Sequence, residues 1–294
     1  WTSLIDWSSL HGFSLPSQSL LLKWRRHPPQ AAGWPPFFEA EARGLALLAQ
    51  TNTVRVPRVY AHGPATGARP AFIVMEWVDS APARRDVGGL PARAADAAGA
   101  KGSAATPGAL LGRQLAALHC ATADAYGLDH NNFCGDTPQD NRWASSWVEF
   151  YGQRRLGFQM ELAGRRGLMP RERRWRLERL IAGLARWIDE AACRPSLLHG
   201  DLWGGNWLVD AAGRPVLIDP AVYYGDREAE LAMCRLFGGF PPEFYRAYDE
   251  AWPPAPGRDE RIPLYQLYHL LNHLNLFGEG YGSQVDAVLQ RYVG

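Results

Sequence analysis

Short apolar stretches in the first part of the chain predict β-strands. They are residues 18–24 (QSLLLKW), 54–63 (VRVPRVYAHG) and 71–78 (AFIVMEWV). The third is bounded on both sides by proline-containing segments that favour turns. Lys23 interrupts the first stretch near its end, which indicates a strand with one charged side chain that reaches inward.

A helix is predicted directly after the first strand. The prolines at 35–36 suit the first turn of a helix. Phe38, Leu45 and Leu48 then form an apolar stripe at helical spacing, and Glu41 falls on or beside that stripe. A carboxylate in that position needs a partner, so Glu41 is a candidate functional residue. Glu39 is a weaker candidate because its helical phase differs.

Most of the remaining chain is predicted to be helical. Thr106 is the expected N-cap of a helix through His119, and residues 146–149 form a capping box for a helix that reaches about residue 163. Residues 171–192 carry an apolar face and predict a single helix. Further helices are expected to start at prolines 242 and 263, and Ser283 is the expected cap of the last one.

Two short apolar strands, 206–209 and 215–219, are joined by the turn-forming sequence Asp-Ala-Ala-Gly and predict a hairpin. Residues 80–106 are rich in Ala, Gly, Arg and Pro without helical or strand periodicity, which indicates an exposed connection. We therefore expect a strand-rich N-terminal lobe (1–79), this connector (80–106) and a larger helical lobe (107–294). The predicted fold class is α+β with two lobes.

Composition limits the kinds of protein this can be. The 294 residues carry a net charge of only +1, which does not favour a nucleic-acid-binding protein. Four scattered cysteines without a CxxC pair predict neither a disulfide framework nor a cysteine zinc site, and favour a reducing compartment such as the cytoplasm. No apolar run reaches the roughly 20 residues of a membrane helix. The sequence starts at Trp1, so a targeting peptide before it is compatible with the sequence.

The densest chemical signal is the segment 199–206, HGDLWGGN, followed by Asp219 at the end of the hairpin. Phosphoryl transfer needs a carboxylate beside the accepting hydroxyl and oxygen ligands for Mg²⁺. Asp201, Asn206 and Asp219 supply these groups on one loop and hairpin. An isolated Asp would more often stabilise a turn, but the spacing of all three favours catalysis.

Other residues near these motifs have two interpretations. Trp203 lies inside the loop and offers a flat apolar face to a sugar, although it could instead pack between the lobes. His199 is expected to shape the loop and not to act as a base. His269 and His273 lie one helical turn apart, but no third metal ligand is near them in the sequence, so we expect packing or substrate-side roles.

HGDLWGGN resembles the HGDLxxxN catalytic loop of aminoglycoside phosphotransferases and related small-molecule kinases, and IDP replaces the DFG of protein kinases. Three longer segments resemble one particular family of such kinases, the fructosamine-3-kinase (ketosamine-3-kinase) family. These segments are HGDLWGGNWLVD, IDPAVYYGDREAELAMCRLFGGFPPEFYRAY and YQLYHLLNHLNLFG. WVEFYGQRRL and FEAEARGLALL also resemble that family. The resemblance covers residues 18–78 and 107–294, and the motifs of the C-terminal part are the most specific.

The resemblance implies a protein-kinase-like fold and a kinase that uses ATP and Mg²⁺. Its substrates would be ketosamines, either small ribulosamines and fructosamines or glycated lysines of proteins, and phosphorylation would reverse glycation. Lys23 would hold the α- and β-phosphates and pair with Glu41. The segment Met75-Glu76-Trp77-Val78 would be the hinge that pairs with adenine.

In the same resemblance Asp201 would orient or accept the proton of the sugar hydroxyl. Asn206 and Asp219 would bind Mg²⁺, and Trp203 would contact the substrate.

The first residues depart from the family pattern. A glycine-containing phosphate loop is expected before Lys23, yet that stretch has only Gly12. Residues 5–6 would correspond to the loop and 8–13 to the next strand, with the Ser3 and Ser8 hydroxyls as possible substitutes for backbone N–H groups. The 80–106 segment has no evident counterpart. Two alternatives therefore stay open: a kinase of another hydroxylated amine, such as an aminoglycoside or choline, and a nucleotide-binding pseudokinase without turnover.

Overall fold

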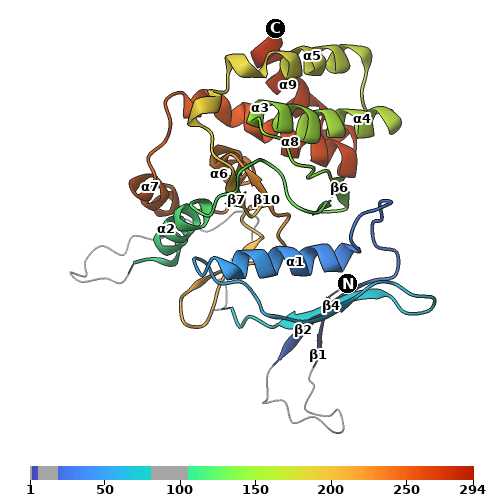
Figure 1. The fold of residues 1–294 in the computed structure, drawn as a ribbon, viewed down its shortest axis with the longest axis vertical. Helices are drawn as coiled ribbons and strands as arrows, with labels where there is room; N and C mark the ends of the chain where they lie inside the picture. The colour runs from blue at the N-terminus through green and yellow to red at the C-terminus, as the bar shows by residue number, and fades with distance from the viewer. Residues whose placement is uncertain (1, 6–18, 81–104) are drawn as a thin grey trace.

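The computed structural model describes residues 2–5, 19–80 and 105–294. The expected strand at 8–13, Gly12, Ser8 and nearly all of the 80–106 connector lie outside these residues. Within them, Figure 1 shows a sheet with one helix beside it at one end of the molecule and a group of helices at the other. This is the predicted α+β arrangement. The exact lobe boundaries stay a prediction.

The N-terminal part is a four-stranded antiparallel sheet with the order β1-β2-β4-β3. Helix α1 packs on it through Phe38 and Leu45, which contact Ile73 and Met75 in one apolar cluster. The strands are β1 (Thr2–Ile5), β2 (Leu20–Arg25), β3 (Val59–Gly63) and β4 (Ala71–Glu76), and the helix is α1 (Phe37–Gln50).

The strand predicted at 54–63 starts later than expected. β3 begins at Val59 because Pro57 has no N–H for a ladder bond, and Arg55 instead bridges to Val216 of strand β9 (Pro215–Leu217). Helix α1 starts at Phe37, directly after the two prolines, as predicted.

The C-terminal part is mainly helical, with short strand pairs between the helices (Figure 1). Its largest apolar cluster surrounds Trp147, which is fully buried and donates a hydrogen bond to the hydroxyl of Tyr265. The helices are α2 (Pro107–His119), α3 (Trp147–Glu149), α4 (Phe158–Arg165), α5 (Arg171–Ala182), α6 (Arg227–Leu236), α7 (Pro242–Ala251), α8 (Arg258–Phe277) and α9 (Gly282–Val293). The strands are β5 (Asn132–Cys134), β6 (Thr137–Gln139), β7 (Ser196–Leu198), β8 (Trp207–Val209), β9 (Pro215–Leu217) and β10 (Tyr223–Gly225).

Several predicted helix starts and the predicted hairpin agree with the structure. The Thr106 hydroxyl caps α2 by accepting from the N–H of Ala109, and the Ser146 hydroxyl caps α3 by accepting from the N–H of Glu149. Strands β8 and β9 form the predicted antiparallel hairpin. The helix predicted from 146 to 163 contains an unpredicted π-helical stretch, Phe150–Gly157, between α3 and α4.

Three helix predictions were wrong in detail. The helix expected over 171–192 ends at Ala182, because Gly183 leaves helical geometry, and 3-10 turns follow at Leu184–Arg186 and Glu190–Ala192. Helix α8 starts at Arg258, so Pro263 lies inside it and not at its start, and its missing N–H removes one intrahelical hydrogen bond. Ser283 is not the cap of α9, which follows the 3-10 turn Glu279–Tyr281 and begins at Gly282.

Among the helices of the described ranges, none has both the length and the apolar character required to cross a bilayer.

Candidate active site

A cavity of about 300 Å³ lies between the sheet and the helical part, and all the predicted phosphoryl-transfer residues line it. Strand β2 and α1 form one wall, and the segments after β7 and β9 form the other. The lining residues are Lys23, Trp24, Arg25, Phe37, Phe38, Ala40, Glu41, Asn132, Phe133, Gly135, Asp136, Asp201, Trp203, Asn206, Asp219, Pro220 and Ala221.

Lys23 on β2 connects the two walls of the cavity. Its Nζ lies 2.8 Å from Oε1 of Glu41 on α1 and is also hydrogen-bonded to Asp219, 196 positions away in the sequence. Burial alone would lower the pKa of Lys23, but the two carboxylates outweigh burial and raise it, so the ammonium stays charged. The other candidate, Glu39, pairs with Arg43 on the outside of the helix.

Asp201 and Asn206 belong to the loop between β7 and β8. Asn206 donates from Nδ2 to the backbone oxygen of Asp201 at 2.8 Å and to its carboxylate at 3.5 Å. These two bonds fix the Asn206 side chain. Both use Nδ2, so Oδ1 takes no part in them. The N–H of Ile218 donates to the backbone oxygen of Asn206 at 3.0 Å, which joins this loop to the end of β9.

Two glycines allow the loop to adopt its path. Gly200 has φ of +84°, and a Cβ there would lie 2.0 Å from the backbone oxygen of Ala221. At Gly204 a Cβ would lie 2.7 Å from Cα of Gly239, in the segment after α6. Close approach of neighbouring chain segments therefore requires glycine at both positions.

The electrostatic environment of Asp201 suits a proton acceptor. Burial, with the nearby carboxylates of Asp219 and Glu230, raises the pKa of Asp201 to about 7, while hydrogen bonds from Cys134 and Asn206 oppose this rise. A base whose pKa lies near neutrality combines a substantial ionised fraction with proton affinity.

His199 holds the loop against β9. Its Nε2 lies 2.9 Å from the backbone oxygen of Ile218, which can only accept, so Nε2 carries the proton. Nδ1 is then the acceptor for the N–H of Asp201 at 3.4 Å. Burial lowers the pKa of His199, which keeps the ring neutral. With both nitrogens engaged by backbone groups, His199 shapes the loop.

Sequence reasoning missed Glu230, the buried carboxylate that anchors the same loop. On α6, it accepts from the N–H of His199 at 2.9 Å and from the N–H of Gly200 at 2.7 Å. Nε2 of His119 lies 3.1 Å from the same carboxylate, and Nδ1 of His119 lies 2.7 Å from the Tyr248 hydroxyl. The available sequence signal was a glutamate placed between Ala229 and the apolar run Leu231–Met233, and the structure shows that this part of the helix is buried.

A second polar network fixes the segment after Asp219. Nδ2 of Asn132 donates to the backbone oxygen of Val222 at 2.8 Å, and Nε2 of Gln139 donates to that of Ala221 at 3.0 Å. The hydroxyl of Tyr268 on α8 donates to Oε1 of Gln139 at 2.6 Å. Asp219 itself has φ of +56°, an uncommon conformation for a residue with a side chain. These contacts hold the strained residue in place.

The predicted hinge segment lies outside the cavity lining, whereas the predicted substrate residue Trp203 belongs to it. The hinge segment, Met75 to Val78, lies at and beyond the end of β4, outside the cavity lining described above. The N–H of Glu76 donates to the backbone oxygen of Arg58 at 2.8 Å, and Met75 is buried in the N-terminal core. Trp203 lines the cavity and is 42% exposed, which distinguishes it from the fully buried Trp147.

The fold and the site together define a protein-kinase-like phosphotransferase. A lysine–glutamate pair faces an aspartate, an asparagine and a second aspartate across a cleft between a sheet and a helical lobe. A family model for fructosamine kinase matches residues 27–294. The chain belongs to the fructosamine kinase family.

Individual relatives agree with this assignment. A protein assigned as a ketoamine kinase in Lactiplantibacillus plantarum is 41% identical over 256 residues, which are 87% of this chain and 82% of that one. The chloroplastic protein-ribulosamine 3-kinase of Oryza sativa subsp. indica is 40% identical over 269 residues, which are 88% and 69% of the two chains. The crystal structure of a protein assigned as a fructosamine-3-kinase in Haemophilus somnus 129PT has a TM-score of 0.75 and 28% identity, covering 94% of this chain and 84% of the other.

Proposed function

We propose that this protein transfers the γ-phosphate of ATP to a sugar hydroxyl of a ketosamine, either a small ribulosamine or fructosamine or a glycated lysine of a protein. The observation that carries the proposal is the convergence of Asp201, Asn206 and Asp219 on one cavity that also contains the Lys23–Glu41 pair. The family relatives, named for ketoamines and ribulosamines, support the choice of substrate.

In this proposal the substrate hydroxyl binds beside Asp201. The hydroxyl oxygen forms the new bond to the γ-phosphorus as the bond to the β–γ bridging oxygen breaks, and ADP leaves. The carboxylate of Asp201 accepts the hydroxyl proton, and a pKa of about 7 makes that transfer feasible near neutral pH. Asn206 and Glu230, through their bonds to the loop, keep Asp201 in position.

The donor groups at the cavity suit Mg²⁺. Asn206 and Asp219 both line it and offer an amide and a carboxylate oxygen, the hard ligands that Mg²⁺ prefers. A bound Mg²⁺ would supply neutralisation of the phosphate charge. The Lys23 ammonium, already held by Glu41, would face the α- and β-phosphates from the other wall.

For the remaining residues, the roles follow from position. Within residues 75–78 the N–H groups of Glu76 and Trp77 already donate to the backbone oxygens of Arg58 and Ser19, so adenine would pair with other backbone groups of this segment. Trp203 would present its exposed ring to the sugar, and the positively charged amine of a ketosamine would be attracted by the same aromatic face.

A substrate panel tests the proposal. The purified chain is incubated with ATP, Mg²⁺ and, separately, ribulose-lysine, fructose-lysine, kanamycin or choline, and ADP release and the phosphorus spectrum of the product are followed. Turnover on the ketosamines alone is expected. Turnover only on kanamycin or choline would replace the substrate assignment, and nucleotide binding without any turnover would make the chain a pseudokinase.

Replacing Lys23 with methionine is expected to lower kcat/KM for ATP about a hundredfold, because one preorganised positive charge facing the phosphates is lost. Steady-state kinetics with a ketosamine substrate measures the effect. Arg26→Met removes an exposed charge just after β2 that does not line the active-site cavity, and serves as the control with kinetics near those of the unaltered chain. Equal losses in both variants would argue against a phosphate-binding role for Lys23.

A further inference from the structure

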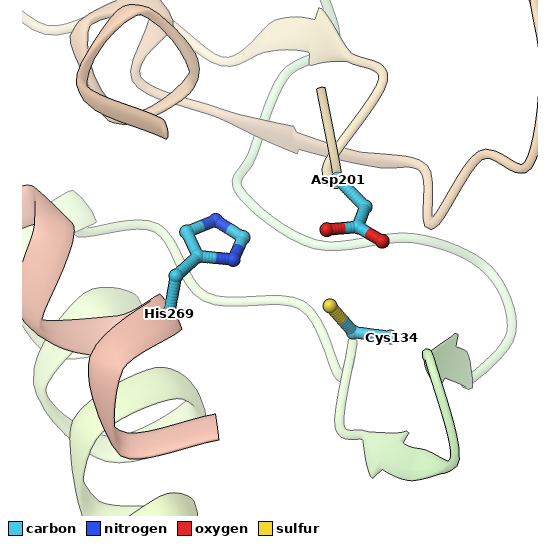
Figure 2. A group of neighbouring side chains, drawn as sticks. All are labelled: Cys134, Asp201 and His269. Carbon is cyan, nitrogen blue, oxygen red and sulfur yellow. The ribbon is translucent and has the colours of Figure 1, made fainter. Parts of the chain in front are cut away.

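Asp201 is one of three potential metal ligands that lie close together. Cys134 at the end of β5, Asp201 in the catalytic loop and His269 on α8 each offer one ligand atom, and these atoms all lie within 4.8 Å of one another. Figure 2 shows the thiol, the carboxylate and the imidazole directed toward a shared space. No sequence motif groups them, because the three residues lie far apart in the sequence, at positions 134, 201 and 269.

The imidazole of His269 is the independent sign of a ligand. The residue is 4% exposed, and its Nδ1 is buried with no hydrogen-bond partner in the part of the chain that the structure describes. A buried polar atom without a partner is costly and calls for an explanation. In Figure 2 the ring nitrogen next to Cγ is the one that faces Asp201 and Cys134.

The other two ligands are also positioned by the fold. Cys134 is 1% exposed, and Nδ2 of Asn272 donates to its sulfur at 3.4 Å and to its backbone oxygen at 3.3 Å. Asp201 is held by the network of Asn206 and Glu230 described above. All three side chains thus approach the same point from elements that are separately anchored.

We propose that Cys134, Asp201 and His269 form a binding site for a soft or borderline divalent cation, and that this cation is Zn²⁺. One sulfur, one nitrogen and one oxygen ligand select Zn²⁺ over Mg²⁺, which prefers oxygen alone. Three protein ligands with one open position are a usual arrangement for zinc outside purely structural sites. This site is different from the Mg²⁺ ligands Asn206 and Asp219.

The geometry requires only a small contraction. Zinc–sulfur and zinc–nitrogen bonds of about 2.3 and 2.0 Å place the ligand atoms of a tetrahedral site about 3.5 Å apart, compared with the upper limit of 4.8 Å here. Metal binding exchanges the thiol proton of Cys134 for a sulfur–metal bond and releases that proton to solvent. The resulting thiolate and the Asp201 carboxylate together balance the charge of the cation.

A metal can reach the group from the active-site cavity. Asp201 lines that cavity, as do Phe133 and Gly135 on either side of Cys134. The cation would bind at the floor of the cavity and remove the Asp201 carboxylate from the substrate hydroxyl. Zn²⁺ is therefore a reversible inhibitor in this proposal. The inhibition, but not the binding, depends on the proposed function of Asp201.

Cadmium titration of the full chain tests the site without reference to activity. Cd²⁺ bound to a thiolate gives an ultraviolet charge-transfer band, and the titration is done without nucleotide because ATP chelates metals. One equivalent is expected to bind, with Zn²⁺ competing for it. Cys134→Ser is expected to lose the band, and His269→Asn to weaken binding at least about tenfold.

Cys120→Ser is the matched control, since Cys120 is an exposed free cysteine. It is expected to bind Cd²⁺ like the unaltered chain. Circular dichroism and thermal unfolding check that each variant is folded. A band that survives in Cys134→Ser, the absence of any band in the unaltered chain, or undiminished binding in folded His269→Asn would each overturn the site.

Activity measurements then separate the site from its consequence. Zn²⁺ is expected to inhibit the unaltered chain, with recovery on addition of a chelator, and to inhibit Cys134→Ser at least about tenfold less strongly. A chain that binds Cd²⁺ as predicted but turns over none of the substrates would contradict the proposed function and leave the metal site standing. Equal inhibition of both chains would refute the inhibitory role.

Discussion

Asp201→Asn is expected to reduce turnover of a ketosamine about a hundredfold or more while ATP binding is retained, as for the loss of a positioned general base. The amide has nearly the shape of the carboxylate and can keep its contact with Asn206, so the loop is expected to stay in place. It cannot accept the hydroxyl proton. Steady-state kinetics and calorimetric titration with a nucleotide analogue measure the two effects separately.

A control for this variant is Asp129→Asn, an aspartate whose side chain is 79% exposed and pairs with the neighbouring His130. Its kinetics are expected to match those of the unaltered chain. If Asp201→Asn retained near-normal turnover, Asp201 would have no role as a base. If it lost ATP binding as well as turnover, the effect would be one of loop structure.

Glu230→Ala is expected to lower the free energy of unfolding by about 3–5 kcal/mol, since removing one partner of a buried charged network leaves the others uncompensated. The N–H groups of His199 and Gly200 and the Nε2 of His119 would all lose their acceptor. Urea unfolding measures the change. Turnover of the folded fraction is also expected to fall, because the loop that carries Asp201 is displaced.

Glu250→Ala is the matched control for this experiment. Its carboxylate is 67% exposed and lies 4.0 Å from Arg246, so a change within about 0.5 kcal/mol is expected. A loss of less than about 1 kcal/mol in Glu230→Ala would show that other groups or water replace the carboxylate.

The pH dependence gives a second readout for Glu230. Burial alone would raise its pKa, but the hydrogen bonds that its carboxylate receives from His119 and from the N–H of His199 outweigh burial and lower it. The folded chain therefore holds this proton less tightly than the unfolded chain, and the stabilisation is present above the ordinary glutamate pKa and lost as the pH falls through the lowered value. Acidification is expected to destabilise the unaltered chain more than Glu230→Ala.

The sequence alone determined the features that depend on nearby residues. Hydroxyl caps at Thr106 and Ser146, the start of α1 after its prolines and the β8–β9 hairpin all follow from short-range hydrogen bonds or backbone restrictions. The spacing of Asp201, Asn206 and Asp219 was likewise readable, because one loop and one hairpin carry all three. Helical phase was enough to select Glu41 over Glu39.

Only the tertiary structure decided which distant groups meet. His119 and Glu230 are 111 positions apart, and Lys23 and Asp219 are 196 apart. Cys134 and His269 reach Asp201 from a short strand and a helix that have no common local signal. Whether these side chains meet depends on how the helices and strands pack. That packing is determined by the burial of side chains throughout the chain, so a local sequence pattern cannot predict it.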